Sequence, residues 1–155
     1  MKTIILTPPS ILCDSDKGYK KVFLAGSINQ GTTVDWQKKI IEAVQDSKRI
    51  IYNPRRESWD ASWEQSIDNP KFKEQVEWEL DALENSDMII MNLEPGTMSP
   101  ISLLEFGLFA RSGKLVVYCP SGFWRKGNVD VVCEKYAVPQ VEKFEELITL
   151  IKYMQ

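Results

Sequence analysis

Short, nearly continuous apolar runs alternate along the chain with longer segments whose apolar residues recur at helical spacing. The apolar runs predict strands that are buried on both faces, and the periodic segments predict helices. We expect strands at "KKVFLA" (20–25), "RIIYNP" (49–54), "DMIIMN" (87–92) and "KLVVYCP" (114–120), and helices over about 33–47, 71–86, 99–114, 129–136 and 141–153.

The alternation of strands and helices predicts the fold class and the place where a ligand would bind. It favours an α/β fold, a three-layer sandwich whose central sheet is mainly parallel, with flavodoxin-like or Rossmann-like topology. We expect a single domain over residues 1–155, with residues 1–19 as an N-terminal extension. Ligands of such folds bind beyond the carboxyl ends of the strands, so the loops after the predicted strands should surround one crevice.

The composition excludes several classes of protein. With 155 residues and a net charge of −3, the chain lacks the basic character of a general nucleic-acid binder, so we expect no nucleic-acid polymer as a partner. The chain has no histidine, which excludes histidine-based triads, histidine metal sites and histidine general bases. Acid–base chemistry must therefore rest on carboxylates, tyrosine, lysine or cysteine.

The sequence also predicts where the protein works. The three cysteines, Cys13, Cys119 and Cys133, are widely spaced and form no Cys-x-x-Cys pair, as is common in a reducing, cytoplasmic setting. No stretch approaches the ~20 apolar residues that a membrane-spanning helix needs. Pro8 and Pro9 interrupt the apolar run at the N-terminus, so we expect neither a membrane partner nor a signal peptide.

Two acidic residues interrupt apolar patterns in neighbouring predicted helices. Glu105 is the only charged residue between Pro95 and Ala110. In the helix over 71–86, a projection at about 100° per residue places Glu79 inside the apolar stripe. On the opposite side fall Glu74, Glu77, Asp81 and Glu84. The stripe consists of Phe72, Val76 and Leu83, with Leu80 at its margin.

A carboxylate on a core-facing stripe is unfavourable unless it is paired, hydrogen-bonded or neutralised, and such violations tend to collect at functional sites. Two carboxylates in different environments can cleave a glycosidic bond, because one attacks or stabilises the anomeric carbon while the other handles the proton of the leaving group. Either acid could instead reach solvent or pair with Arg111, and this structural explanation stays open for each acid alone.

Three segments resemble the nucleoside 2-deoxyribosyltransferase superfamily, in particular its second, less-characterised branch, over roughly residues 20–136. "VFLAGSI" is similar to the family's first strand and Ala-Gly turn. "ELDALENSDMIIMN" resembles the family segment in which an acid, here Glu79, stands eight residues before the Asp that opens the next strand, here Asp87. "SPISLLEFGLFARSGK" resembles the signature in which a nucleophilic Glu, here Glu105, precedes x-Gly and a Gly-Lys turn.

The resemblance implies an enzyme of nucleotide salvage, a pentosyltransferase that acts on N-glycosidic bonds, with hydrolysis as a side activity. Glu105 would attack C1′ of a 2′-deoxynucleoside to form a covalent glycosyl-enzyme, and Glu79 would protonate the departing base and later deprotonate the incoming one. The resemblance implies no cofactor and no metal. The implied partners are 2′-deoxynucleosides, nucleobases and further copies of the chain, in a homo-oligomer that completes its sites between subunits.

Departures from the transferase pattern keep two other functions open. Where the transferases carry an Asp that contacts the base, six residues before the nucleophile, this chain has Ser99. A Ser there, and Ser27 in the "GSI" turn, resemble the sister family of 2′-deoxynucleoside 5′-monophosphate N-glycosidases, in which they help to hold phosphate. That family has an Arg where this chain has Asn29, and an Asp where this chain has Glu79. A nucleotide-binding sensor without turnover is the third alternative.

The remaining candidates for substrate binding lie at the ends of the predicted strands. The "GSINQG" segment could cradle a phosphate or a sugar hydroxyl with its backbone amides, or be only a tight turn. Asn92 would orient a carboxylate, and Asn128 resembles the Asn that the transferases lend to the neighbouring subunit's site. The full set of substrate-binding candidates is Gly26, Ser27, Ile28, Asn29, Ser99, Asn92 and Asn128. Tryptophans near the crevice could stack on a base or pack in a core; they are Trp59, Trp63 and Trp78.

Overall fold

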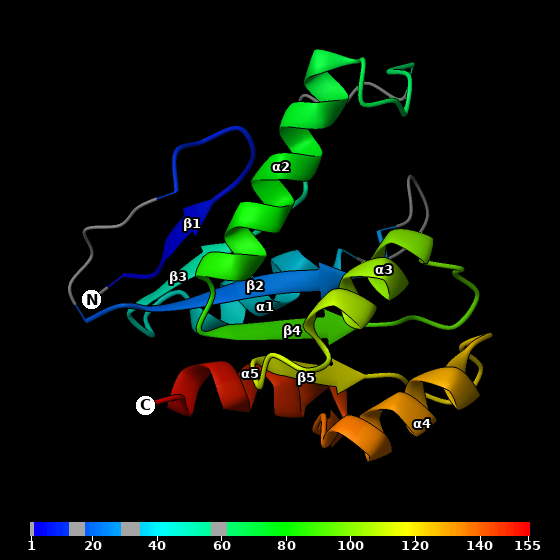
Figure 1. The fold of residues 1–155 in the computed structure, drawn as a ribbon. Helices are drawn as coiled ribbons and strands as arrows, with labels where there is room; N and C mark the ends of the chain where they lie inside the picture. The colour runs from blue at the N-terminus through cyan, green and yellow to red at the C-terminus, as the bar shows by residue number, and fades with distance from the viewer. Residues whose placement is uncertain (1, 13–17, 29–34, 57–61) are drawn as a thin grey trace.

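A computed structural model of the chain describes residues 2–12, 18–28, 35–56 and 62–155 (Figure 1). Within these residues, strands and helices alternate along most of the chain. In order they are β1 (Ile4–Leu6), β2 (Lys20–Gly26), α1 (Trp36–Val44), β3 (Arg49–Tyr52), α2 (Pro70–Asn85), β4 (Met88–Asn92), α3 (Pro100–Phe109), β5 (Leu115–Tyr118), α4 (Lys126–Tyr136), β6 (Gln140–Val141) and α5 (Phe144–Tyr153).

The six strands form one sheet in the order β1-β3-β2-β4-β5-β6, and every neighbouring pair is parallel. The five strands from β2 onward have the flavodoxin-like order, and β1 is added at the edge beside β3. The direction of the chain across the sheet reverses at β2, which pairs with β3 on one side and with β4 on the other. The expected α/β fold with a parallel central sheet is confirmed.

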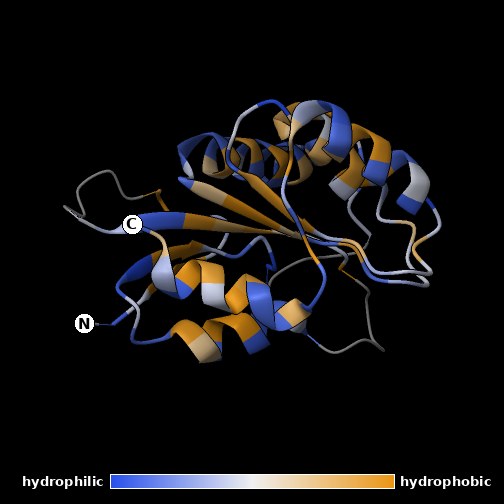
Figure 2. Ribbon diagram, turned by 90° about the horizontal axis from the view of Figure 1, so that it is seen from below, coloured by the Kyte–Doolittle hydropathy of each residue, from blue (hydrophilic) through white to orange (hydrophobic). Residues whose placement is uncertain are grey.

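Helices cover both faces of the sheet, which explains the nearly continuous apolar runs of its strands. In β2, Val22 and Leu24 face α1 and α5, whereas Phe23 and Ala25 face α2, α3 and α4. Figure 1 shows the second group of helices in front of the sheet, and Figure 2 shows the hydrophobic strands between two helical layers. Because both faces are covered, each strand needs apolar residues at successive positions rather than at alternate ones.

The structure contains two strands that the sequence pattern does not predict. β1 pairs Ile4 with Ile50 of β3, so part of the predicted N-terminal extension belongs to the sheet. β6 pairs with the end of β5. Both are short edge strands, three and two residues long, and such strands are too short to produce a recognisable period. Within the described residues, no helix is long and apolar enough to cross a membrane.

The predicted core stripe of α2 is partly wrong. The residues of α2 that are buried are Gln75, Trp78, Ala82 and Leu83. Of the predicted stripe, only Leu83 belongs to this set. The other members, Phe72, Val76 and Leu80, line a cavity together with Glu79. The helix therefore carries apolar residues on a core face and on a cavity face, and the sequence pattern merges the two faces into one stripe.

α3 is likewise apolar on more than its core face. Phe106 and Phe109 are buried, whereas Leu104 and Leu108 are 61% and 57% exposed. A helix that is hydrophobic on all sides is normally buried on all sides. The exposed side of α3 is therefore an unusual surface, and it borders a cavity.

Gly26 ends β2 where its backbone lies close against that of Asn92 in β4. Its φ of +132° lies in a region that favours glycine, and a Cβ at this position would lie 2.1 Å from the carbonyl oxygen of Asn92. The amide of Ser27 donates to the same oxygen at 2.8 Å. Only glycine allows the ends of β2 and β4 to meet in this way.

We therefore expect Gly26→Ala to lower the free energy of unfolding by at least about 2 kcal/mol, because both the backbone conformation and the contact with Asn92 must change. The matched control is Gly127→Ala in α4, where a Cβ meets no atom within 4 Å. It should leave the stability unchanged or raise it by up to about 1 kcal/mol. Urea unfolding measures both, and equal effects of the two substitutions would contradict the prediction.

Candidate active site

A cavity of about 1150 Å³ lies at the carboxyl end of β2, where the strand order reverses. Its walls come from the carboxyl end of β2, the loop after β3, the first three turns of α2, and the beginning and middle of α3. This is the position at which open parallel sheets bind their ligands. Both acids that interrupted the helical patterns, Glu79 and Glu105, line this cavity.

Burial and mutual repulsion shape the chemistry of the two acids. Glu105 is only 8% exposed. Loss of solvent, and to a lesser extent the neighbouring charge of Glu79, raise the pKa of Glu105 from 4.5 to about 8. Burial also raises the pKa of Glu79, but a hydrogen bond from Gln75 opposes this effect. Near neutral pH the pair therefore tends to retain one proton rather than carry two charges.

Gln75 holds Glu79 from one turn earlier on α2. Its amide nitrogen donates to Glu79 Oε1 at 2.8 Å and to the carbonyl oxygen of Pro54 at 3.1 Å. The apolar pattern of α2 does not single out Gln75. The signal that could have found it is the spacing of four residues, which places a glutamine directly beside the misplaced acid on a helix surface.

A cluster of three hydroxyl groups lies below the N-terminus of α3. The Ser27 Oγ atom is 2.9 Å from Thr97 Oγ1 and 2.7 Å from Ser99 Oγ, and the last two atoms are 2.8 Å apart. The cluster is tied to the loop after β4, because the amide of Glu94 donates to Ser27 Oγ and Thr97 Oγ1 donates to the Glu94 carbonyl. Of the three hydroxyl residues, Ser99 lines the cavity.

Ser99 has an unusual backbone conformation. It precedes Pro100 at the start of α3 with φ +49° and ψ +52°, in the left-handed region that non-glycine residues seldom adopt. Its hydroxyl does not cap the helix but bonds within the hydroxyl cluster. Strain of this kind costs about 1–3 kcal/mol and collects at functional sites, where the surroundings hold it in place.

The other substrate-binding candidates are distributed between the cavity and its supporting layer. Gly26 and Ile28 line the cavity. Ser27 and Asn92 are buried, and Asn92 Nδ2 donates to Glu94 Oε1 at 3.2 Å, so both support the wall rather than form it. Asn128 is exposed on α4 and does not line the cavity, whereas the resemblance assigns it to a neighbouring subunit's site. Asn29 lies outside the described residues.

Two arginines line the cavity on the side of the loop after β3. The Nε atom of Arg55 donates to Gln37 Oε1 at 2.9 Å and lies 3.2 Å from Asp35 Oδ1. Arg56 forms an ion pair with Glu74 at 3.0 Å, and its guanidinium lies over the ring of Trp63. The positive charges of this wall are therefore balanced locally by carboxylates.

Trp78 serves the fold and does not face the large cavity. Its ring packs edge-on against Tyr52, and its indole nitrogen donates to the carbonyl oxygen of Ser10 at 2.8 Å. Of the two alternatives for the tryptophans, core packing holds for Trp78. Trp59 lies outside the described residues.

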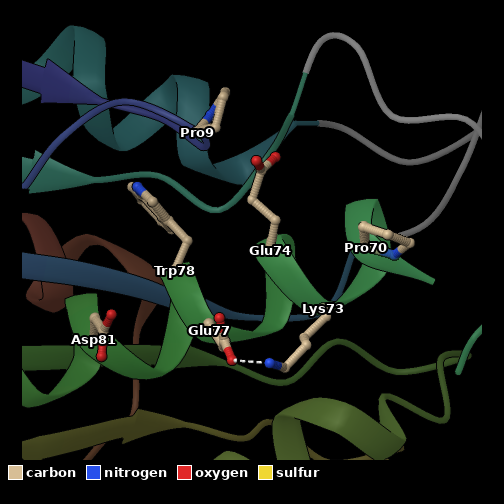
Figure 3. Close-up of a pocket in the computed structure, with 7 residues that line it drawn as sticks. All are labelled: Pro9, Pro70, Lys73, Glu74, Glu77, Trp78 and Asp81. Atoms are coloured by element: carbon tan, nitrogen blue, oxygen red, sulfur yellow. Dashed lines mark ion pairs between the residues drawn. The ribbon is translucent and has the colours of Figure 1, made fainter. Parts of the chain in front are cut away.

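A second hollow lies on the opposite side of α2 (Figure 3). Figure 3 shows that its side chains come mostly from α2, where Lys73 and Glu77 form an ion pair at 3.1 Å. Neither Glu79 nor Glu105 lines it. Its exposed carboxylates belong to the solvated face of an amphipathic helix and need no further explanation.

The described residues contain no group of three or more carboxylate or cysteine side chains that could hold a metal ion. Cys119 and Cys133 are buried free thiols, and burial raises the pKa of each to about 11. Such thiols stay protonated near neutral pH and are poor nucleophiles. The buried carboxyl groups that line the cavity are those of Glu79 and Glu105. Asp35 also lines it, but its side chain is partly exposed and its carboxylate lies beside Arg55.

Two neighbouring carboxyl groups lie where the strand order of the parallel sheet reverses, a place called its switch point. Such a pair is suited to glycosyl chemistry. Comparison with known families agrees with this arrangement. Residues 19–123 match the family model described as "Nucleoside 2-deoxyribosyltransferase like". The chain belongs to this family, which is associated with glycosyl transfer or hydrolysis on nucleosides. The resemblance inferred from the sequence is confirmed.

The fold is also similar to that of a solved structure. The crystal structure of a conserved protein from Enterococcus faecalis has a TM-score of 0.63 with this chain at 15% sequence identity. The similarity covers 88% of this chain and 99% of that chain. At this identity the likeness shows the fold alone. A search of curated proteins found no match to the chain.

The raised pKa of Glu105 leads to a prediction about stability. Because the folded-state pKa is near 8 and the ordinary value is 4.5, the unfolded chain releases this proton at a lower pH than the folded protein does. The contribution of Glu105 to stability is therefore lost as the pH rises from about 4.5 to about 8. Glu105→Gln cannot ionise, so its stability relative to the wild type should rise by about 2–4 kcal/mol between pH 5 and pH 9.

Urea unfolding at the two pH values measures this difference. In a Glu79→Gln background the repulsion between the carboxyl groups is absent, so the upper end of the pH window should move to lower pH. A difference between Glu105→Gln and the wild type that is the same at both pH values would contradict the assignment of a raised pKa to Glu105.

Proposed function

We propose that the protein is a nucleoside 2′-deoxyribosyltransferase that passes the deoxyribosyl group from one nucleobase to another through a covalent intermediate on Glu105. The observation that carries the proposal is the pair of coupled carboxyl groups, Glu79 and Glu105, in one cavity at the sheet's switch point. They come from different helices and differ in their hydrogen bonding. Such a difference allows one to act as nucleophile and the other as proton donor.

In the first step, a carboxylate oxygen of Glu105 forms a bond to C1′ while the bond from C1′ to the base nitrogen breaks. The proton of Glu79 moves to the departing base, so the base leaves as a neutral molecule. In the second step, a nitrogen of the incoming base attacks C1′ and the ester bond to Glu105 breaks. Glu79 takes the proton from the incoming base and is ready for another cycle.

This mechanism requires the charge on Glu105 and the proton on Glu79. In the free protein the amide of Gln75 favours the charged form of Glu79, so the substrate must reverse the preference. The positive charge that develops at C1′ provides a reason for the reversal, because it stabilises an adjacent carboxylate on Glu105. Burial makes this attraction strong, since little solvent is present to screen it.

A second candidate function is the hydrolysis of 2′-deoxynucleoside 5′-monophosphates. The observation that favours it is the hydroxyl cluster of Ser27, Thr97 and Ser99 next to the N-terminus of α3. Hydroxyl donors beside a helix N-terminus suit an anionic group. In this function the same two carboxyl groups would act, with water in place of the incoming base.

The protein should work as a homo-oligomer. The exposed side of α3 and the loop before it carry Met98, Ile101, Leu104 and Leu108, which are between 57% and 62% exposed. The same four residues line the cavity. A second copy seated on this surface would bury the apolar side chains and would also close the cavity against water. This arrangement fits a site that is completed between subunits.

The activity can be tested by incubating the protein with deoxyinosine and adenine, and separately with deoxynucleoside 5′-monophosphates, followed by chromatography. Deoxyadenosine is the expected product. Free base from the monophosphates alone would favour the second candidate, and binding without product would favour the sensor. Glu105→Ala should lose at least about a thousandfold in rate, because it lacks the nucleophile. Full activity of this variant would exclude Glu105 as the nucleophile.

The oligomer can be tested by a charge on the exposed surface of α3. We expect Leu104→Lys to shift the protein to monomers in light scattering after size exclusion, because a buried unpaired ammonium opposes association. Val131→Lys on α4 is the matched control, since Val131 is 68% exposed and does not line the cavity. The same oligomeric state for the wild type and Leu104→Lys would contradict an interface on α3.

A further inference from the structure

The amide group of Gln75 has an orientation that the surrounding atoms determine. Its nitrogen contacts the carbonyl oxygen of Pro54 at 3.1 Å, and a backbone carbonyl can only accept. The nitrogen rather than the oxygen must therefore face Pro54. The same nitrogen contacts Glu79 Oε1 at 2.8 Å, so its two protons are both used, one on each acceptor.

This geometry makes the two oxygens of Glu79 different from each other. Oε1 accepts a hydrogen bond from the Gln75 amide, so it presents a lone pair rather than a proton there. A proton carried by the Glu79 carboxyl group consequently resides on Oε2. An acid that turns freely could carry its proton on either oxygen, whereas Glu79 offers it from one defined position.

The oxygen of the Gln75 amide gives a second reason to assign a role to the amide nitrogen. Gln75 is only 6% exposed, and its Oε1 atom is buried without a hydrogen-bond partner among the described residues. A buried acceptor without a partner is unfavourable for the fold. An apolar side chain of similar size would avoid this cost, but it would also remove the donor from the Pro54 carbonyl and from Glu79. The amide is therefore kept for its donor end, which serves these two acceptors.

We propose that Gln75 is a positioning residue for the reaction, which holds Glu79 so that Oε2 delivers its proton to the departing base. The inference rests on the proposed function, because it assigns Glu79 the role of proton donor. The Pro54 carbonyl is part of the device, since it fixes the rotation of the Gln75 amide. The loop after β3 is thereby connected to the proton donor on α2.

The surroundings of Glu79 determine how its pKa should change when Gln75 is replaced. The cavity is also lined by Glu105 from α3, by Arg55 and Arg56 from the loop after β3, and by Asp35 ahead of α1. Burial raises the pKa of Glu79 and the hydrogen bond from Gln75 lowers it. Loss of that bond should therefore raise the pKa of Glu79 further, which makes it a weaker acid and leaves its carboxyl group free to rotate.

The test compares Gln75→Met with the wild type in the release of hypoxanthine from deoxyinosine, with adenine present as the acceptor, across a range of pH. We expect the rate to fall about tenfold to a hundredfold, because proton donation becomes less well aligned. The alkaline limb of the pH profile should move to higher pH, since the proton donor keeps its proton longer. A purely structural role would slow the reaction without moving this limb.

A second substrate separates proton donation from all other steps. The base of 7-methyl-2′-deoxyguanosine already carries a positive charge and leaves without being protonated. Gln75→Met should therefore cleave it at a rate close to that of the wild type, whereas Glu105→Gln should cleave neither substrate. Equal losses on both substrates would overturn the positioning role.

Two further variants complete the design. Gln37→Met removes another buried glutamine, whose amide holds Arg55 rather than Glu79, and should leave the alkaline limb in place. If Gln75→Met fails to fold in a thermal melt, Gln75→Asn keeps the amide but withdraws it by one methylene, and should move the limb in the same direction. Gln75 variants that match the wild type on deoxyinosine would overturn the inference alone. A wild type that releases no base from either substrate would overturn the proposed function as well.

Discussion

The parallel pairing of β2 with β4 is the contact on which the rest of the site depends. It places the ends of two strands side by side, with Gly26 against Asn92, and makes β2 the point where the strand order reverses. In the chain, α2 precedes β4 and α3 follows it, and both helices pack on the same face of the sheet. The two carboxyl groups are therefore brought together by one strand and its two flanking helices.

The same arrangement sets the electrostatic conditions of the cavity. Two carboxyl groups share a poorly solvated space, and each disfavours the charge of the other. Because ionisation of one group opposes ionisation of the other, the two groups titrate as a pair and share one proton. The protein sacrifices stability to keep this pair at neutral pH, which is a common relation between a fold and the site that it carries. The strained backbone of Ser99 beside the cavity is a further example of this relation.

The sequence predicted the longer strands and helices and the two acids that interrupt their apolar patterns, because both depend on local patterns. It did not predict β1 and β6, whose lengths are too short to show a period. The stripe on α2 was misassigned because side chains that line a cavity are as apolar as those in a core. The hydroxyl cluster joins Ser27 to Thr97 and Ser99, which are 70 and 72 positions away. The resemblance named the two serines together, but no local pattern could reveal their contact or the part that Thr97 has in it. The role of Gln75 depends on a contact with Pro54 that only the folded chain creates.

The two unpredicted strands have a consequence for how copies of the chain can meet. β1 and β6 stand at the two edges of the sheet and are three and two residues long. A long, bare edge strand offers its unpaired amides and carbonyls to any neighbouring strand, and native proteins avoid this hazard by keeping their edges short. The sheet of this protein therefore ends at both sides with little backbone left to extend it, which disfavours the addition of a strand from another chain at either edge.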